Sequence, residues 1–320
     1  MFLYIVGLVA LFLIYRWLKE LKRVPNKGDR FVYITGCDSG FGNLLARHLD
    51  TLGYRVIAGC YTEKGEDELR KITSDRMTTL QLDVTDAASV AKAADNIKSL
   101  VGNKGLWAVV NNAGVTHPSA PTDWLTIEDY RGMLAVNLDG VISVTLSILP
   151  LIKKAKGRVV NVSSVFGRIS PFGGPYSISK YGVEAFTDSL RVNMSPFGVT
   201  VCCLEPGFFR TNAANEDLME ASLTKLWNKL PQDVKDDYGH DFKDKALALM
   251  NKRLAQILDP DLMKVVSCME HAISAVHPRK RYSPGYDTKM LWLPLSYMPS
   301  CLTDWWFSRN RIKLKISSVQ

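Results

Sequence analysis

The feature that most constrains the fold is a regular alternation, from residue 30 onward, of short β-branched runs with longer segments of helical period. This alternation predicts βαβ units, and therefore a parallel sheet wound with helices. The expected strands are 31–35, 55–60, 79–82, 107–111, 158–162 and 199–204, and the expected helices include 43–52, 88–100 and 176–194. No internal repeat or Pro/Gly-rich linker divides residues 30–285. We therefore expect one α/β domain built on a doubly wound parallel sheet.

A glycine-rich loop follows the first expected strand, with the sequence Thr35-Gly36-Cys37-Asp38-Ser39-Gly40-Phe41-Gly42. Glycines at these positions allow a tight turn and close backbone approach, and the start of the next helix offers N–H groups to a pyrophosphate. The spacing TGxxxGxG departs from the GxGxxG of other dinucleotide folds. By itself, such a loop is also what an ordinary turn looks like.

Tyr176 and Lys180 are four residues apart in an expected helix, which places both side chains on one face. A tyrosine has a pKa of about 10, and a nearby ammonium that favours the phenolate brings that pKa toward neutrality. A tyrosine of this kind can take the proton of a substrate hydroxyl group. Taken alone, the spacing fits a surface helix pair equally well.

The order of several motifs resembles the short-chain dehydrogenase/reductase family over residues 30–285. The motifs are the glycine loop, Asp83-Val84, Asn111-Asn112-Ala113-Gly114, Asn137, Ser163-Ser164, Tyr176-x-x-x-Lys180, and Pro206-Gly207 with Thr211. The resemblance implies a Rossmann-type fold, a nicotinamide cofactor and a catalytic group of Asn137, Ser164, Tyr176 and Lys180. In this group Ser164 also binds the substrate oxygen. Ser163 is the alternative, because neighbouring side chains at a strand end point opposite ways.

The same resemblance implies a set of cofactor contacts. They are Gly36, Asp38, Ser39, Gly40, Phe41, Gly42, Asp83, Val84, Asn112, Ala113, Gly114, Tyr176, Lys180, Pro206, Gly207 and Thr211. A basic residue before Gly40 would favour the phosphate of NADP, but Ser39 stands there. Asp38 would repel that phosphate, whereas Lys64 lies close enough along the chain to attract it. We predict NAD, with NADP as the alternative.

The first 15 residues carry no charge, and the apolar character extends to Leu18. A helix of 15 to 18 residues covers much of a bilayer core about 30 Å thick, so we expect residues 1–18 to be a membrane anchor and 19–29 a basic linker. A cleaved signal peptide is the alternative, although no basic region precedes the apolar run. By the positive-inside rule, the basic linker places the body in the cytosol, at the endoplasmic reticulum membrane.

The C-terminal residues 286–320 are expected to be an apolar, membrane-associated tail. Pro294, Pro299 and Asp304 make this segment a poor spanning helix, so it is either an interfacial contact or a segment packed on the body. The interfacial reading places three tryptophans at headgroup level: Trp292, Trp305 and Trp306. Of the net charge of +8, residues 1–23 contribute +3 and residues 305–320 contribute +4. The body therefore offers no basic footprint for nucleic acid, and none is expected as a partner.

Several stretches narrow the resemblance to membrane-bound retinol dehydrogenases and 3α/17β-hydroxysteroid dehydrogenases, among them 34–43, 104–107, 120–125 and 297–299. It implies oxidation of retinol to retinal, or of 3α/17β-hydroxysteroids to ketosteroids, and the helix at 176–194 is a dimer face in related proteins. Residues 212–257 predict a helical insertion that overhangs the ligand crevice.

Two alternatives stay open. One is a catalytically silent protein that binds a lipid or a partner, and the other is a lumenal enzyme that is glycosylated at Asn193. The scattered histidines predict no metal site, and the six cysteines have no CxxC pair, which predicts free thiols.

Overall fold

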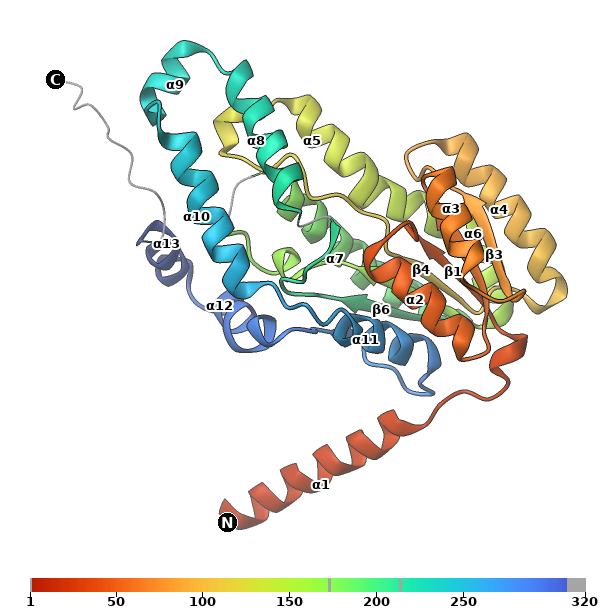
Figure 1. Ribbon diagram of the computed structural model, residues 1–320. Coiled ribbons are helices and arrows are strands. Elements are labelled where there is room, and N and C mark those ends of the chain that lie inside the picture. The colour runs from red at the N-terminus through yellow and green to blue at the C-terminus, as the bar shows by residue number, and fades with distance from the viewer. Residues whose placement is uncertain (1, 172–173, 213–214, 310–320) are drawn as a thin grey trace.

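The computed structural model describes residues 2–171, 174–212 and 215–309, with side chains from Tyr4 onward. Its centre is a parallel sheet of seven strands in the order β3-β2-β1-β4-β5-β6-β7 (Figure 1). The strands are β1 (Phe31–Thr35), β2 (Arg55–Cys60), β3 (Met77–Gln81), β4 (Ala108–Asn111), β5 (Arg158–Val162), β6 (Thr200–Leu204) and β7 (Arg281–Tyr282). Three of the six predicted strands have the predicted bounds, and the other three differ by one or two residues. The sequence analysis did not find β7, which has only two residues.

Helices cover both faces of the sheet, so each strand is buried on two sides. Along β1, Val32 and Ile34 belong to one core cluster and Tyr33 to the other, as the alternation of side chains along a strand requires. The first cluster lies under α2 (Gly40–Thr51), α3 (Glu63–Lys71) and α11 (Met263–Ser274). The second lies under α4 (Ala87–Val101), α6 (Gly140–Ala155) and α7 (Pro175–Met194). The predicted doubly wound α/β fold is confirmed, and all six cysteines are free thiols.

Residues 212–257, for which the sequence predicts a helical insertion, contain three helices: α8 (Glu216–Lys229), α9 (Gln232–Tyr238) and α10 (Phe242–Ile257). The segment leaves and rejoins the body beside the carboxyl end of β6, where Phe209 forms a β-bridge with Asp259. Its apolar core includes Trp124, which precedes α5 (Ile127–Leu134) and contacts the rings of Trp227 and Phe242. The insertion therefore packs as a small helical subdomain at one edge of the sheet.

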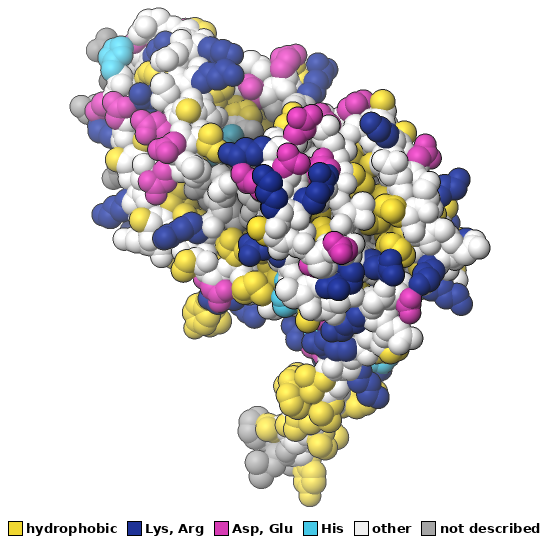
Figure 2. Space-filling view, turned by 45° about the vertical axis from the view of Figure 1, so that its right-hand side comes forward, with side chains coloured by type: hydrophobic (Ala, Val, Ile, Leu, Met, Phe, Trp, Pro, Cys, Tyr) yellow, Lys and Arg dark blue, Asp and Glu magenta, His cyan; other side chains and the backbone are white. Residues whose placement is uncertain are grey.

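Helix α1 (Phe2–Leu21) projects away from the body (Figure 1). Its large apolar side chains from Tyr4 to Leu21 are 47–80% exposed, so the described protein does not cover them. Hydrophobic side chains cover the projecting helix, and lysines and arginines gather where it meets the body (Figure 2). Within the described residues, one helical stretch is long and apolar enough to cross a membrane, Ile127–Ala155, and it packs on the sheet as a core helix.

The chain after α1 is fixed to the body. Val24 N–H donates to the Ser274 carbonyl at 2.7 Å, and Val276 N–H donates to the Lys22 carbonyl at 2.8 Å. The Glu20 carboxylate accepts hydrogen bonds from Arg279 at 2.5 and 2.8 Å. The linker expected at 19–29 is therefore held by residues that follow α11.

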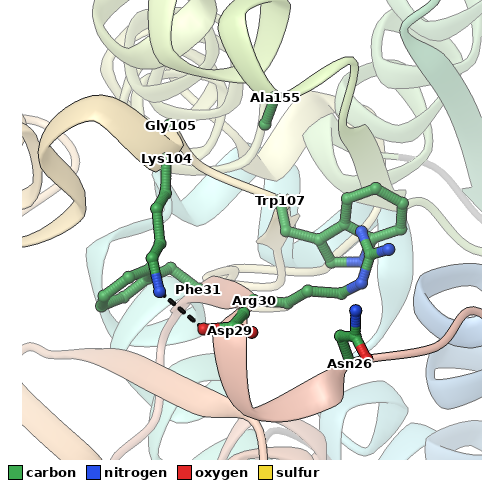
Figure 3. A pocket seen from close by; sticks show the side chains of 8 residues that line it. All are labelled: Asn26, Asp29, Arg30, Phe31, Lys104, Gly105, Trp107 and Ala155. Carbon is green, nitrogen blue, oxygen red and sulfur yellow. Dashed lines mark hydrogen bonds and ion pairs between the residues drawn. The ribbon is translucent and has the colours of Figure 1, made fainter.

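A shallow hollow lies further along the linker, where Arg30 stacks on the Trp107 ring at 3.6 Å and Lys104 pairs with Asp29 at 2.6 Å (Figure 3). Phe31 and Trp107 stand at the amino ends of β1 and β4. The hollow is therefore at the opposite edge of the sheet from the expected catalytic residues.

The tail begins with a π-helical turn (Thr288–Trp292) and continues through α12 (Leu293–Ser296) and α13 (Ser300–Arg309). Large side chains of α13 and the preceding turn are exposed, namely Tyr297, Met298, Leu302, Trp305 and Trp306. Trp292 differs from them, because it is partly buried and packs against the rings of Phe166 and Phe208. Trp292 therefore contacts the body, and its place at headgroup level stays a prediction.

Candidate active site

The expected site residues collect at the carboxyl ends of the central strands. Gly36, Asn112, Ser163 and Pro206 follow β1, β4, β5 and β6, respectively, within two residues of each strand end. In the sheet order, β1 and β4 are neighbours, and the chain winds outward from them in both directions. Such a switch point opens a crevice at the carboxyl edge, which is where open α/β sheets bind ligands.

The glycine loop is tightly packed at Gly36 and Gly42 and open at Gly40, which lies between them. Gly36 has a φ of +70°, and a Cβ added there would lie 2.8 Å from the Ala113 Cα. A Cβ at Gly42 would lie 2.3 Å from the Gly36 carbonyl oxygen. At Gly40, with a φ of +62°, an added Cβ would approach nothing closer than Thr211 at 3.8 Å. Glycine is therefore required at Gly36 and Gly42 by close backbone approach, whereas Gly40 leaves open space.

Hydrogen bonds hold this loop against the end of β4. The Asn112 side chain donates to the carbonyls of Thr35 and Gly36 at 3.0 Å each. The Thr35 hydroxyl in turn accepts from the backbone N–H groups of Asn112 and Ala113 at 3.0 Å. Ser39 precedes α2 in an extended conformation, and its side chain makes no capping bond. The first N–H groups of α2 are therefore left for an anion, which fits the pyrophosphate of a dinucleotide.

Asp38 lies where the loop meets the end of β2. Its carboxylate accepts hydrogen bonds from Tyr61 N–H at 2.8 Å, Thr62 N–H at 2.9 Å and the Thr62 hydroxyl at 2.7 Å. A Cβ added at Gly65, in the first turn of α3, would lie 2.5 Å from Asp38 Oδ1. The sequence places no acidic residue at the end of β2, and the structure brings the loop carboxylate to that place.

Asp83 and Val84 follow β3 and have different surroundings. The Asp83 carboxylate accepts from the N–H and the hydroxyl of Thr85 at 2.9 and 2.7 Å. Val84 packs closely on α6, because a Cβ added at Gly140 would lie 2.8 Å from its Cγ2. These contacts fix the turn after β3 on the same edge of the sheet as the glycine loop.

Helix α7, which carries Tyr176 and Lys180, begins with Pro175 in its first turn, after Gly174 at a φ of +107°. Tyr176 and Lys180 follow on one face, and the Lys180 Nζ lies 5.7 Å from the centre of the Tyr176 ring. Lys180 is buried and its Nζ donates to the Val162 carbonyl at 3.0 Å. Burial lowers the pKa of Lys180 to about 8.

The pKa of Tyr176 differs from the sequence-based expectation. Burial raises this pKa above its ordinary value, and a hydrogen bond from the Ser164 side chain opposes the rise. The Lys180 ammonium group, already bonded to Val162, does not bring the pKa toward neutrality here as the sequence analysis expects. Desolvation outweighs the lysine in this arrangement because both groups are withdrawn from water.

The two candidate serines have different partners. Ser163 Oγ donates to the Lys180 carbonyl at 3.2 Å, so it joins β5 to α7. Ser164 Oγ accepts from Phe166 N–H at 3.2 Å and bonds to Tyr176. This geometry favours Ser164 as the serine that binds a substrate oxygen.

Asn137 is fully buried in a π-helical turn (Ala135–Asp139) between α5 and α6. Its side chain donates to the Val115 carbonyl at 2.8 Å and to Ser179 Oγ at 3.1 Å, and it accepts from Val115 N–H at 2.8 Å. A Cβ added at Gly114 would lie 3.2 Å from Asn137 Oδ1 and 3.6 Å from Lys180 Nζ. The extra residue of the π turn thus brings Asn137 beside Lys180.

Pro206 and Gly207 form the wall opposite the glycine loop. Val165 N–H donates to the Pro206 carbonyl at 3.0 Å, and Gly207 N–H donates to the Pro284 carbonyl at 3.1 Å. Asp287 supports the same turn, because it accepts from Phe208 N–H at 3.1 Å and would lie 2.3 Å from a Cβ added at Gly207. Asp287 is not among the predicted site residues, because no sequence motif around it indicates contact with a turn 80 residues earlier.

An aromatic cluster borders Tyr176. The ring of Phe166 contacts those of Tyr176, Phe208 and Trp292, with centres 6.3, 5.4 and 5.8 Å apart. Phe208 and Trp292 also contact each other at 5.9 Å. All four rings are partly exposed. An apolar aromatic surface therefore adjoins the hydroxyl groups of Tyr176 and Ser164.

Comparisons with known proteins agree with this geometry. Residues 30–221 match the profile of the short chain dehydrogenase family. The chain is 50% identical to retinol dehydrogenase 16 from Homo sapiens over 320 residues, covering 98% of this chain and 99% of the relative. It is 49% identical to 17-beta-hydroxysteroid dehydrogenase type 6 from Bos taurus over 310 residues, covering 97% of this chain and 98% of the relative.

Among solved structures, a short-chain dehydrogenase from Streptomyces avermitilis matches with a TM-score of 0.67 at 25% identity. The match covers 88% of this chain and 98% of that one. The overall fold of the chain is thus shared with a solved short-chain dehydrogenase. The chain belongs to the short-chain dehydrogenase family and is an NAD(P)-dependent oxidoreductase.

Proposed function

We propose that this chain is a membrane-anchored alcohol dehydrogenase of lipophilic substrates, which oxidises retinol to retinal, 3α/17β-hydroxysteroids to ketosteroids, or both. One observation carries the proposal: Ser164, Tyr176 and Lys180 meet at the dinucleotide crevice beside an apolar aromatic cluster. The names of relatives about half identical over nearly their whole length support the same substrate classes.

Each of the site residues has its own part in the proposed reaction. When bound, the oxidised nicotinamide supplies the hydride acceptor and a positive charge. Ser164 holds the substrate oxygen by a hydrogen bond that strengthens as charge develops on that oxygen. Tyr176 accepts the hydroxyl proton, and Lys180 holds its Nζ 5.7 Å from the centre of the Tyr176 ring, beside the phenolate that would form. Asn137 orients the segment after Gly114, so that the turn beside Lys180 keeps its shape.

The apolar cluster supports a substrate with a flat or polyene skeleton. Phe166, Phe208 and Trp292 present ring edges and faces next to Tyr176. Such rings bury a large area against an apolar ligand and hold few polar groups that would choose between similar skeletons. An apolar pocket discriminates only weakly between close analogues, so turnover of both a retinoid and a steroid is expected.

NAD is the favoured cofactor. The Asp38 carboxylate lies at the end of β2, bonded to the backbone of Tyr61 and Thr62, where a ribose is expected to approach. A fixed negative charge there disfavours the added phosphate of NADP. Lys64 is highly exposed and pairs with Glu68 at 3.8 Å, which leaves it a weak competitor.

The anchor is assigned to α1. The part of α1 before Lys19, residues 2–18, is about 25 Å long, which covers most of the hydrocarbon thickness of a bilayer. Its exposed apolar side chains support insertion, and residues 19–29 with their basic side chains then lie at the interface. In this proposal residues 30–285 form the catalytic domain, the helical insertion at 212–257 borders the substrate, and residues 286–320 contact the membrane surface.

The body is assigned to the cytosolic face of the endoplasmic reticulum membrane. Asn161 and Asn193 each begin an Asn-X-Ser sequon for glycosylation. Asn161 is fully buried and bonded to Asn111 and Thr187, so it cannot accept a glycan, whereas Asn193 is exposed. In microsomes the unaltered chain should therefore show no mobility shift on treatment with a glycosidase. A shift that disappears in Asn193→Gln would place the body in the lumen.

A homodimer through α6 and α7 is a further part of the proposal. These helices expose Leu146, Ile178, Tyr181 and Val192, although the rest of their apolar residues pack on the sheet. Cross-linking in detergent should give a dimer band, and Val192→Glu should remove it without loss of fold. A monomer at all concentrations would contradict this part.

The experiment that tests the activity measures initial rates on membranes that contain the chain. All-trans-retinol and a 3α-hydroxysteroid are each assayed with NAD and with NADP, beside Tyr176→Phe. A rate with either alcohol that falls by about 10³-fold or more in Tyr176→Phe supports the enzyme, since the tyrosine supplies the proton acceptor. Absence of turnover above the variant with every pair would favour a catalytically silent protein that binds a lipid or a partner.

A further inference from the structure

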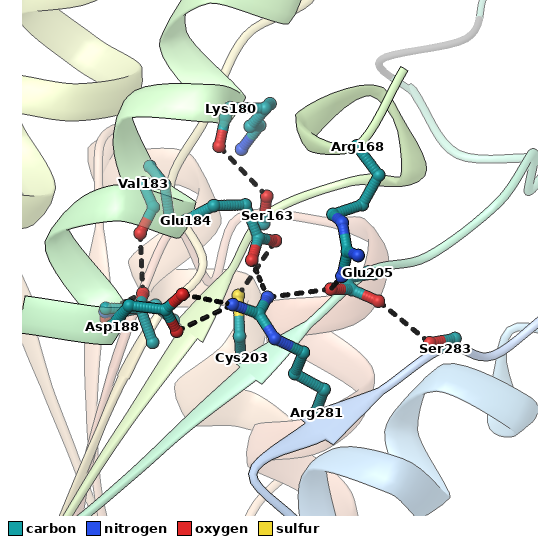
Figure 4. A network of polar contacts seen from close by, with 12 residues as sticks. Ser163, Arg168, Lys180, Val183, Glu184, Asp188, Cys203, Glu205, Arg281 and Ser283 are labelled. Carbon is teal, nitrogen blue, oxygen red and sulfur yellow. Dashed lines mark hydrogen bonds and ion pairs between the residues drawn. The ribbon is translucent and has the colours of Figure 1, made fainter. Parts of the chain in front are cut away.

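A partly buried cluster of charged side chains lies behind the catalytic residues, centred on Arg281 of β7 (Figure 4). Its guanidinium group donates two hydrogen bonds to the Asp188 carboxylate, at 2.6 and 2.7 Å. It also bonds to Glu184 and, at 2.9 Å, to Glu205. A planar guanidinium group with five N–H donors can hold three carboxylates at once, which an ammonium group cannot do with the same geometry.

The partners of Arg281 belong to different segments of the site. Glu184 is one helical turn after Lys180 on α7, and Asp188 is one turn further. Glu205 stands directly before Pro206, whose carbonyl joins the turn to Val165. Arg281 therefore connects the helix of the catalytic lysine to the turn that forms the opposite wall of the crevice.

A third segment joins through Glu205. Arg168, four residues after Ser164, donates to Glu205 Oε1 at 3.1 Å, and Ser283 donates to Oε2 at 2.9 Å. The loop between Ser164 and Arg168 also packs tightly on α7, because a Cβ added at Gly167 would lie 2.9 Å from the Lys180 carbonyl oxygen. The segments that carry Ser164, Lys180 and Pro206 thus meet in one network of ion pairs.

The surroundings make this network sensitive to the loss of its central cation. Glu205 is 1% exposed and Glu184 is 6% exposed, so water does not readily replace Arg281 at either carboxylate. Without Arg281, Glu205 keeps Arg168 and Ser283, whereas Glu184 keeps the Cys203 thiol and loses its ion pair. Breaking a buried pair leaves an uncompensated charge, whose cost exceeds the net gain from the pair. In addition, β7 has only two residues paired with β6, so few backbone bonds hold this strand in place.

We propose that Arg281 is a positioning residue for hydride transfer, which sets the relative places of Ser164, of α7 with Tyr176 and Lys180, and of the Pro206-Gly207 turn. The inference rests on the proposed function for its kinetic consequence. Arg281 touches none of the reacting groups and acts through Glu184, Asp188 and Glu205. Displacement of reacting groups by about 1 Å lowers a rate about 10²-fold, which sets the size of the expected effect.

The test compares Arg281→Met and Arg281→Lys with the unaltered full chain in membranes. We expect kcat to fall about 10- to 100-fold in Arg281→Met and less in Arg281→Lys. Lysine keeps the positive charge but lacks the planar group with five N–H donors. The KM for NAD should rise less than kcat falls, because the network holds Lys180 and the Pro206-Gly207 turn, whereas the glycine loop on β1 and α2 lies outside it. Hydrogen exchange should become faster in 163–168, 180–188 and 205–209.

Arg279→Met is the matched control. Arg279 is two residues away, and it bonds to Glu20 at 2.5 and 2.8 Å at the base of α1 instead of to the site. It should leave kcat and exchange in the three segments unchanged. If Arg281→Met does not fold, the double variant Arg281→Met/Glu184→Gln removes one charge of each sign, and it should fold with a low kcat.

Three outcomes would overturn the inference: unchanged kcat in folded Arg281→Met, an equal loss in Arg279→Met, or full recovery of kcat in the double variant. Hydrogen exchange separates this inference from the proposed function. If the unaltered chain turns over neither alcohol, the proposed function fails. Faster exchange in the three segments, seen in Arg281→Met and absent from Arg279→Met, would still support the network, and exchange confined to β7 would refute it.

Discussion

Substitution of Gly36 by alanine tests the account of the glycine loop, because two separate costs can be assigned to it. Its φ of +70° is a left-handed conformation, which costs a side-chain-bearing residue roughly 1–2 kcal/mol. The added Cβ would also lie 2.8 Å from the Ala113 Cα. That backbone is held by the Thr35 and Asn112 hydrogen bonds and cannot shift freely, so the overlap adds about 1–3 kcal/mol.

Two other glycines separate these costs. Gly53 has a φ of +88° and nothing within 4 Å of an added Cβ, so Gly53→Ala has only the conformational cost. Gly132 lies in α5 with open space around it and no positive φ, so Gly132→Ala should be neutral or stabilising by up to about 1 kcal/mol. The expected order of loss is therefore Gly36, then Gly53, then Gly132.

The assay is thermal unfolding in detergent together with the Kd for NADH. At about 2–4 °C per kcal/mol for large domains, Gly36→Ala should lower the Tm by about 4–20 °C and Gly53→Ala by about 2–8 °C. Gly36→Ala should also weaken NADH binding more than about tenfold, since 1.4 kcal/mol of distortion at the loop has that effect. Equal losses in Gly36→Ala and Gly53→Ala would refute the close-approach argument, and so would unchanged NADH binding.

Three further predictions follow from the site. Ser164→Ala should lower kcat about 10²-fold, because it loses a hydrogen bond to the reacting oxygen, whereas Ser163→Ala should lower the Tm and leave kcat within about threefold; the reverse result would exchange their roles. The pKa of Lys180 is lowered to about 8, so the unfolded chain binds one more proton between about pH 8 and 10.5 and stability rises with pH there. The free energy of unfolding of the unaltered chain, relative to Lys180→Met, should rise by up to about 1.4 kcal/mol per pH unit in this range, and a flat difference would contradict the burial of Lys180. Trp292→Ala should raise the KM for retinol about tenfold and leave the KM for NAD unchanged; unchanged KM for retinol would remove Trp292 from the substrate wall.

The sequence predicts the central sheet well because the alternation of buried strands and amphipathic helices is a local signal. Val32, Tyr33 and Ile34 are all apolar since both sides of β1 are covered, and this continuous apolar run is visible without a structure. In contrast, β7 is held by Arg281 through partners 76 to 97 residues away, and two residues carry no strand signal.

Some features of the candidate site can be predicted from the sequence, and others depend on the folded structure. The glycine loop and the Tyr176-x-x-x-Lys180 spacing are fixed by local geometry and can be read from the sequence. The raised pKa of Tyr176 cannot, because it depends on how far the folded chain withdraws the side chain from water. Trp292 looks like its exposed neighbours Trp305 and Trp306, and only packing against Phe166 and Phe208 distinguishes it.

The joint between α1 and the body has a mechanical consequence. Residues 22–24 are hydrogen-bonded to 274–276, and α11 ends at Ser274 after packing along the sheet, so no free chain lies between α1 and the domain. The helix and the domain therefore tilt together as one rigid unit. Bilayers of different thickness tilt a spanning helix by different angles. In such bilayers the opening of the crevice turns toward or away from the lipid surface, and acyl chain length becomes a determinant of turnover.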